Sequence, residues 1–238
     1  MYIFLSVLFL AYVLFMAIWG YFDIKKYKDK TITENEKLKN YRDGIIIGWI
    51  PVFVLIPICI FFNIKPNDIG FRLIGFHYNF WFTSITIVIC AGFLAFLLYQ
   101  MISYLVSEKY REKIKVEIQK PENKFMYNVI LPHTYKEKKY FFGICLTAGI
   151  VEEIVFRGFV LYILQGLFPD LSIVIILIIA FILFGIGHLY QGIGGILKTA
   201  LVGGIICCLY LVTNSLIFCM VIHFIMDFSS AFIIKEEK

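Results

Sequence analysis

Residues 141–165 have the sequence FFGICLTAGIVEEIVFRGFVLYILQ, which is apolar along almost its whole length. A helix needs roughly 20 apolar residues to cross a hydrocarbon core of roughly 30 Å. Three charged residues, Glu152, Glu153 and Arg157, nevertheless lie inside this stretch. The stretch therefore predicts a membrane-spanning helix that carries charged groups at the depth of the bilayer.

Similar apolar blocks occur along the rest of the chain. They cover residues 2–22, 44–63, 79–104, 171–190, 193–213 and 214–234. The chain is 61% hydrophobic and 16% charged, whereas about a quarter of the residues in a soluble domain are charged. Backbone groups in lipid must satisfy their hydrogen bonds internally, so runs of this length indicate helices and not barrel strands. We expect an all-α fold, a polytopic integral membrane helical bundle with about seven transmembrane helices, in a range of six to eight.

The basic residues concentrate in two polar segments. Residues 23–43 contain seven Lys and Arg, and residues 105–140 contain nine. The other side of a seven-helix bundle would receive only Lys65 and Arg72. Because positive charge stays on the cytoplasmic side, the sequence predicts a multi-pass cell-membrane protein with its amino terminus outside and its carboxyl terminus in the cytoplasm. This distribution explains the net charge of +5, so the expected surroundings are the lipid bilayer and no nucleic-acid partner is expected.

Polar residues inside the apolar blocks are the main indication of function. Besides the three charges of the fourth block, His188 lies near the end of the fifth, and His223 and Asp227 lie inside the seventh. A lone charge at the bilayer centre costs about 2.5–3.5 kcal/mol on insertion scales. We therefore expect these side chains to face one another or a water-containing cavity.

Helical spacing supports this convergence. Glu153 and Arg157 are four residues apart and can pair on one face of a helix, whereas Glu152 is rotated by about 100° and need not share that partner. His223 and Asp227 have the same spacing, so both can point into one cavity. A Glu–Arg pair of this kind is more often structural than catalytic, so we assign Glu153 and Arg157 a supporting role.

A Glu–His–His–Asp set can activate water in two ways. The carboxylate can act as a general base with the imidazoles as partners, or the four residues can bind a metal such as zinc, with Glu152, His188, His223 and Asp227 as possible ligands. The alternative signatures H-E-x-x-H and G-x-S-x-G do not occur in the sequence. The sequence leaves the choice between the glutamate and metal mechanisms open.

Three motifs in order resemble those of the CAAX-protease and bacteriocin-processing family, also called CPBP or Abi proteins. Residues 152–157, EEIVFR, fit E-E-x-x-x-R; residues 184–188, FGIGH, fit F-x-x-x-H; and residues 223–227, HFIMD, fit H-x-x-x-[N/D]. The family includes the eukaryotic type II prenyl-protein endopeptidases and bacterial proteins tied to bacteriocin maturation or self-immunity. The resemblance covers about residues 141–230.

The resemblance implies a role for each matched residue. Glu152 would be the general base, with His188 assisting, and His223 and Asp227 would stabilise the oxyanion. Phe184, like Glu153 and Arg157, would support the site. The prenyl peptidases carry Asn at the position of Asp227, and an ionised aspartate would repel an oxyanion, so its role stays open between protonation, orientation of His223 and metal binding.

The resemblance predicts an intramembrane endopeptidase that cleaves a membrane-associated peptide or protein. In this interpretation residues 1–140 are membrane anchor helices and basic cytoplasmic loops, and residues 141–238 are the catalytic helical core. The alternative is a non-proteolytic membrane scaffold, such as an immunity or sensor-partner protein, in which the polar cluster is a hydrogen-bond network. A proton-coupled transporter is less favoured, because no pair of matched broken helices is visible.

Overall fold

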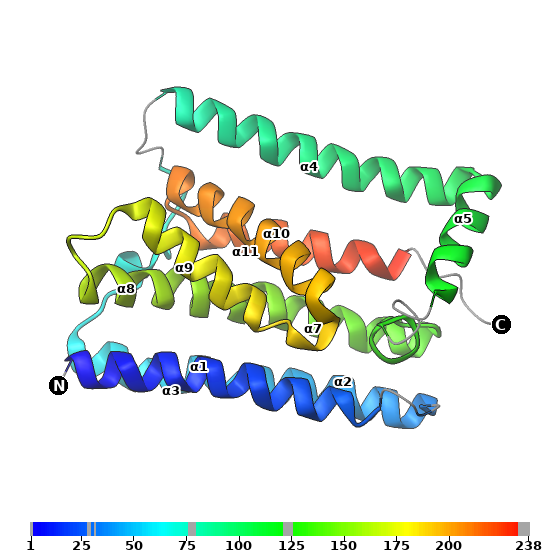
Figure 1. Cartoon of the computed structure of the whole chain (residues 1–238), viewed down its shortest axis with the longest axis horizontal. Helices are drawn as coiled ribbons and strands as arrows, with labels where there is room; N and C mark the ends of the chain where they lie inside the picture. Colours follow the sequence, from blue (N-terminus) through cyan, green and yellow to red (C-terminus); the bar gives the residue numbers. More distant parts are fainter. Residues whose placement is uncertain (1, 28–29, 31, 76–79, 121–125, 233–238) are drawn as a thin grey trace.

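The chain folds as a bundle of helices in the computed structural model, which describes residues 2–27, 30, 32–75, 80–120 and 126–232 (Figure 1). The α-helices are α1 (Tyr2–Lys25), α2 (Glu34–Gly48), α3 (Ile50–Phe62), α4 (Phe80–Val106), α5 (Glu108–Gln119), α7 (Tyr135–Glu152), α8 (Leu161–Leu167), α9 (Ile173–Ile186), α10 (Gly192–Thr213) and α11 (Leu216–Ser229). Short 3₁₀ turns are η1 (Pro66–Ile69), η4 (Leu189–Gln191) and η5 (Ser230–Phe232), and π-helical segments are η2 (Met126–Ile130) and η3 (Glu153–Val160). The all-α expectation is confirmed for this part of the chain.

The chain is a polytopic helical membrane protein. Within the described ranges, four helical segments are long and apolar enough to cross a bilayer: Ile3–Lys25, Glu34–Phe62, Phe80–Val106 and Leu189–Thr213. The α7, η3 and α8 segments follow one another without a break from Tyr135 to Leu167 and carry the charged block.

Two of the predicted blocks are shorter helices than expected. Instead of spanning residues 171–190 and 214–234, α9 and α11 each have 14 residues. Ser172 and Ser215 cap their first turns, accepting hydrogen bonds from the amides of Ile175 and Phe218. At the other end, α9 stops before Gly187, and α11 gives way to a 3₁₀ turn at Ser230. Residues 233 and 234 lie outside the described ranges.

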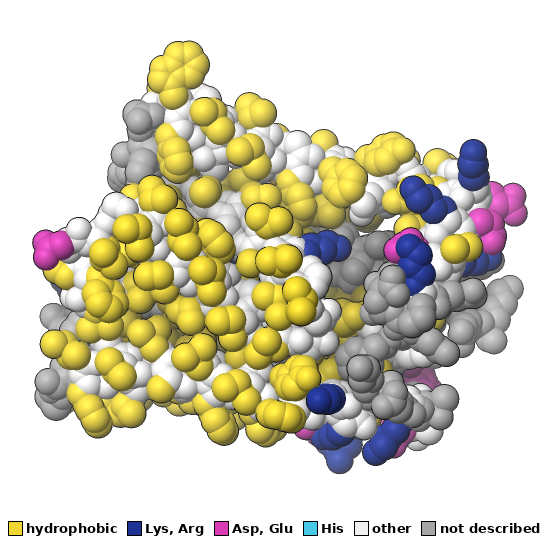
Figure 2. Space-filling model, viewed as in Figure 1, with side chains coloured by type: hydrophobic (Ala, Val, Ile, Leu, Met, Phe, Trp, Pro, Cys, Tyr) yellow, Lys and Arg dark blue, Asp and Glu magenta, His cyan; other side chains and the backbone are white. Residues whose placement is uncertain are grey.

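Charge and apolar surface are separated along the bundle. Figure 2 shows a face that is covered mainly by hydrophobic side chains, with Lys and Arg gathered at one end, near α5 and the α1–α2 connection. Large apolar side chains such as Phe53 on α3 and Val88 on α4 stay exposed. A surface of this kind is expected to face lipid, because exposed apolar patches of this extent are rare on soluble monomers.

Helix α2 packs closely against α7 through glycines. A Cβ atom added at Gly48 would lie 2.8 Å from Cγ2 of Thr147, and one added at Gly44 would lie 3.0 Å from Cδ1 of Ile144. Gly44 and Gly48 form a G-x-x-x-G pattern, which lets helices in membranes approach closely. The expected boundary after residue 140 falls inside α7, which begins at Tyr135 because Thr134 caps it. The division into anchor and core stays a prediction.

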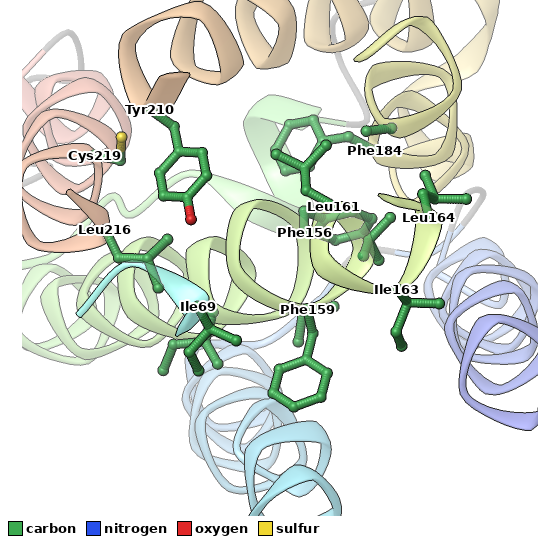
Figure 3. Close-up of a cluster of buried hydrophobic side chains, with 14 of the residues drawn as sticks. Ile69, Phe156, Phe159, Leu161, Ile163, Leu164, Phe184, Tyr210, Leu216 and Cys219 are labelled. Carbon is green, nitrogen blue, oxygen red and sulfur yellow. The ribbon is translucent and has the colours of Figure 1, made fainter. Parts of the chain in front are cut away.

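The apolar core surrounds the π-helical segment η3. Figure 3 shows Phe156 and Phe159 of η3 among buried side chains from α9, α10 and α11, including Phe184, Tyr210 and Leu216. The rings of Phe156 and Phe184 meet edge to face, with centroids 5.0 Å apart. This core fixes the segment that carries Glu153 and Arg157.

Candidate active site

The charged residues of the fourth block lie where the helix changes type. Glu152 is the last residue of α7, and Glu153 and Arg157 belong to the π-helix η3. Single π-helical turns within α-helices occur frequently at functional sites. The sequence predicted a regular helix here, because the apolar pattern does not distinguish the two helix types.

Glu153 and Arg157 form a fully buried ion pair. Nη1 of Arg157 donates to Oε1 of Glu153 at 2.9 Å, and Nη2 donates to the carbonyl oxygen of Gly203 on α10 at 3.0 Å. The guanidinium also lies 4.3 Å from the ring centroid of Phe184. The predicted pairing is confirmed, and it ties η3 to α9 and α10.

The same carboxylate holds His223 of α11. Nδ1 of His223 lies 2.7 Å from Oε1 of Glu153, and its Nε2 lies 3.4 Å from Oδ2 of Asp227 one turn further along α11. Since an ionised carboxylate only accepts, Nδ1 of His223 carries the proton in this hydrogen bond. The imidazole is thereby oriented with Nε2 toward Glu152 and Asp227.

His188 approaches from α9. The sequence predicted it inside the fifth helix, but it follows α9 and precedes the 3₁₀ turn η4, with φ of −110° and ψ of 26°. Its Nδ1 lies 3.0 Å from the carbonyl oxygen of Phe184. A carbonyl oxygen only accepts, so Nδ1 is the donor and Nε2 is left to face Glu152.

Glu152 lies between the two imidazoles. Its Oε2 is 4.0 Å from Nε2 of His188 and 3.9 Å from Nε2 of His223. That oxygen is buried and has no hydrogen-bond partner among the described residues, while the side chain as a whole keeps 29% of its surface exposed. The predicted convergence of the fourth, fifth and seventh blocks is confirmed by these distances. The gaps are too long for direct hydrogen bonds but suit a bridging water.

A cavity of about 300 Å³ opens beside Glu152 and His188. Its walls come from α1, α2, the start of α3, α7, η3 and the two residues after α9. Apart from these two residues, Tyr12 and Thr147, the wall is made of apolar residues, glycines and a proline: Val13, Met16, Ala17, Gly44, Gly48, Pro51, Ile144, Ala148, Val151, Val155, Phe156 and Gly187. The volume is at the lower end of the range for small-molecule sites.

The four polar residues do not form a ready-made metal site. Zinc requires ligand atoms within about 2.0–2.2 Å of one point. Across the part of the chain that the structure describes, no group of three or more His, Cys, Asp or Glu side chains is arranged to hold a metal ion. The possibility of zinc at Glu152, His188, His223 and Asp227 stays a prediction.

A comparison with protein families identifies this region. Residues 137–229 match the family model described as Type II CAAX prenyl endopeptidase Rce1-like. This part of the chain is similar to that family and is referred to as the Rce1-like domain. No curated protein and no solved structure is similar enough to count as a match.

The Rce1-like domain contains all the residues that the sequence singled out. It does not contain the helices α1 and α2, which form much of the cavity wall. Tyr12 of α1, which lines the cavity, was not among the residues predicted from the sequence. A tyrosine in the middle of a long apolar helix was the available signal, because membrane tyrosines are usually enriched near the interfaces.

Proposed function

We propose that the Rce1-like domain is an intramembrane endopeptidase that hydrolyses a peptide bond of a membrane-associated peptide or protein. The observation that carries the proposal is the position of Glu152, whose unpartnered oxygen lies between two imidazoles at the wall of an apolar cavity. Similarity to the Rce1-like family supports the reaction class.

In the proposed mechanism Glu152 is the general base. A water held between its Oε2 and Nε2 of His188 would lose a proton to the carboxylate as its oxygen attacks the carbonyl carbon of the peptide. The proton would then pass to the amide nitrogen as the C–N bond breaks, which releases a carboxyl and an amino product. Nε2 of His188 is suited to hold this water, because its Nδ1 is committed to Phe184.

His223 is proposed to stabilise the negative charge that develops on the carbonyl oxygen. The ring would carry a proton on both nitrogens. Nδ1–H donates to Glu153, which positions the ring before the reaction begins, and Nε2–H would donate to the oxyanion, as electrostatic stabilisation requires. Asp227 lies beside Nε2 of His223, and we assign it the role of orienting this ring rather than contacting the oxyanion. Glu153, Arg157 and Phe184 form the support behind the ring.

We further propose the arrangement in the membrane. The seven apolar blocks would cross the bilayer in turn, with α9 and α11 as short crossings and with the basic end of Figure 2 in the cytoplasm. The amino terminus would then be outside. Residues 1–140 would anchor and wall the site, and residues 141–238 would carry the catalytic groups.

Cleavage by purified protein tests the proposal. Wild type and Glu152→Gln are reconstituted in phosphatidylcholine vesicles in equal folded amounts and offered a set of internally quenched apolar peptides. Wild type is expected to cleave at least one peptide and the variant to be at least a hundredfold slower. Equal rates would remove Glu152 from the mechanism. Metal analysis of the active preparation then separates the glutamate mechanism from a zinc-dependent one.

Glu152→Gln, together with two further variants, also addresses the scaffold alternative. The buried network of Glu153, Arg157 and His223 would also serve a purely structural role, since it links η3, α10 and α11. If cells that carry Glu152→Gln or His188→Ala keep their phenotype while Arg157→Ala lowers protein stability, the scaffold function is supported instead.

A further inference from the structure

The first helix belongs to the wall of the site although it lies outside residues 137–229. Tyr12, Val13, Met16 and Ala17 line the cavity that also contains Glu152 and His188. Helix α1 packs against the turn η4, which directly follows His188. A segment far away in the sequence therefore contributes to the surroundings of the catalytic groups.

Tyr12 is the polar group that α1 brings to this cavity. Its hydroxyl oxygen is buried and has no hydrogen-bond partner among the described residues. Glu152 lines the same cavity, and its Oε2 is likewise buried without a hydrogen-bond partner among the described residues. Buried polar atoms are nearly always paired, so two unpaired ones on residues that line the same cavity indicate that a bound molecule or water completes them.

The position of Tyr12 is fixed by packing. The ring of Phe9 on α1 lies 6.4 Å from the ring of Tyr12 and 5.8 Å from that of Phe159 on η3. Phe9 itself is buried in the main apolar core. Phe9 thus connects Tyr12 on α1 to the π-helix that carries Glu153.

We propose that Tyr12 is a substrate-positioning residue, whose hydroxyl donates a hydrogen bond to a backbone carbonyl oxygen of a peptide held in this cavity. The inference rests on the proposed function. A peptide fits both features of the cavity: its amide groups supply acceptors for the hydroxyl, and its side chains meet an apolar wall. The substrate is accordingly a peptide segment with apolar residues next to the bond that is cleaved.

Removal of one oxygen atom tests the role of Tyr12. Tyr12→Phe keeps the ring and its packing against Phe9, and Tyr21→Phe is the matched control on the same helix, since Tyr21 does not line the cavity. Both are compared with wild type in phosphatidylcholine vesicles, using internally quenched peptides with Leu, Ile or Phe on both sides of one central amide. For Tyr12→Phe we expect KM to rise about tenfold with kcat nearly unchanged, as for the loss of one neutral hydrogen bond to the substrate.

A binding measurement separates this proposal from the proposed function. The same peptides are titrated onto Glu152→Gln protein with and without Tyr12→Phe, so that affinity is obtained without cleavage. If Glu152→Gln protein binds the peptides more weakly once Tyr12→Phe is added, the positioning role is supported. This result holds even if wild type cleaves none of the peptides and the peptidase function fails. Equal KM values for wild type, Tyr12→Phe and Tyr21→Phe, together with equal Kd values for Glu152→Gln protein with and without Tyr12→Phe, would overturn the role of Tyr12 and leave the peptidase function intact.

Discussion

Two buried ion pairs lie on the same long helix and differ in what surrounds them. At its beginning, Glu137 of α7 is 3.1 Å from Nζ of Lys37 on α2, and both side chains are about 95% buried. Further along, Glu153 pairs with Arg157 in η3. If the burial of charged groups were a sufficient criterion, both ion pairs would be identified as functional sites.

The Lys37–Glu137 pair lies near the basic end of the bundle and joins α2 to α7; we call this pair and the contacts around it the clasp. Oε2 of Glu137 also accepts a hydrogen bond from the amide of His133 at 2.6 Å, and Thr134 both caps α7 and donates to Glu34 of α2 at 2.7 Å. These contacts join α2 to the start of α7, and none of these residues lines a cavity described above.

The second pair lies beside the proposed catalytic residues. Glu153 shares its Oε1 with His223, and the neighbouring Glu152 has a buried oxygen with no partner beside a cavity. A buried ion pair by itself therefore does not identify a site. An adjacent unpartnered acid with access to a cavity is the distinguishing feature.

The largest expected difference between the two regions is in the effect of replacing Glu152 or Glu137 on the cleavage rate. Glu152→Gln should reduce peptide cleavage at least a hundredfold, because general-base catalysis contributes about 10²–10⁴-fold, while the unfolding midpoint stays close to that of wild type. Glu137→Gln should do the reverse: it should lower stability and leave the rate per folded molecule unchanged. Cleavage rates and denaturant unfolding of both variants check this, and a similar loss of rate in both would remove the distinction.

Removal of the two cations should give similar losses of stability but different losses of function. Arg157→Met leaves Glu153 buried without its partner, which should cost about 3–5 kcal/mol, and His223 should lose its orientation. Lys37→Met should destabilise the clasp without affecting catalysis by the folded fraction. Both effects can be measured by unfolding in mixed detergent and by initial rates corrected for folded protein. Full activity of folded Arg157→Met would contradict the supporting role.

Two adjacent glycines test the packing behind the site. A Cβ at Gly203 would lie 2.6 Å from Cδ1 of Phe184, whereas one at Gly204 would lie 3.6 Å from Cδ1 of Phe181, an ordinary contact. Gly203→Ala should therefore cost about 1–3 kcal/mol through overpacking and should also slow cleavage, because Phe184 holds His188. Gly204→Ala is the control. Equal unfolding midpoints for the two variants would show that Phe184 moves without cost.

The smallest expected effect lies in the clasp. Thr134→Ala removes the cap of α7 and the hydrogen bond to Glu34, which should cost about 1 kcal/mol. Thr134→Ser keeps the hydroxyl and should behave like wild type in denaturant unfolding. Cleavage by folded protein should be the same for all three, and a specific loss of rate in Thr134→Ala would connect the clasp to the site.

Much of the fold followed from the sequence because lipid imposes simple length rules. The first block was predicted at residues 2–22 and is a helix from Tyr2 to Lys25, and the block predicted at residues 193–213 is α10, Gly192–Thr213. Insertion energetics likewise predicted that Glu152, His188 and His223 face one another or a cavity, and Nε2 of each histidine lies within 4.0 Å of Oε2 of Glu152.

The remaining features depend on contacts between distant segments. The π-helix η3 is packed on several sides by other helices, and no local pattern in EIVFRGFV sets it apart from an α-helix. His188 lies outside α9 because the chain turns at Gly187, although the surrounding residues are as apolar as a helix interior. The contribution of Tyr12 depends on the docking of α1, which residue spacing cannot reveal.

The shortness of α9 and α11 has a consequence for the surrounding lipid. Each has 14 residues, which corresponds to about 21 Å of helix, against a hydrocarbon thickness of about 30 Å. Such a hydrophobic mismatch is relieved when the bilayer becomes locally thinner. Headgroups and solvent would then come closer to His188, two residues beyond the end of α9, so the lipids themselves would help to deliver the water that the proposed reaction consumes.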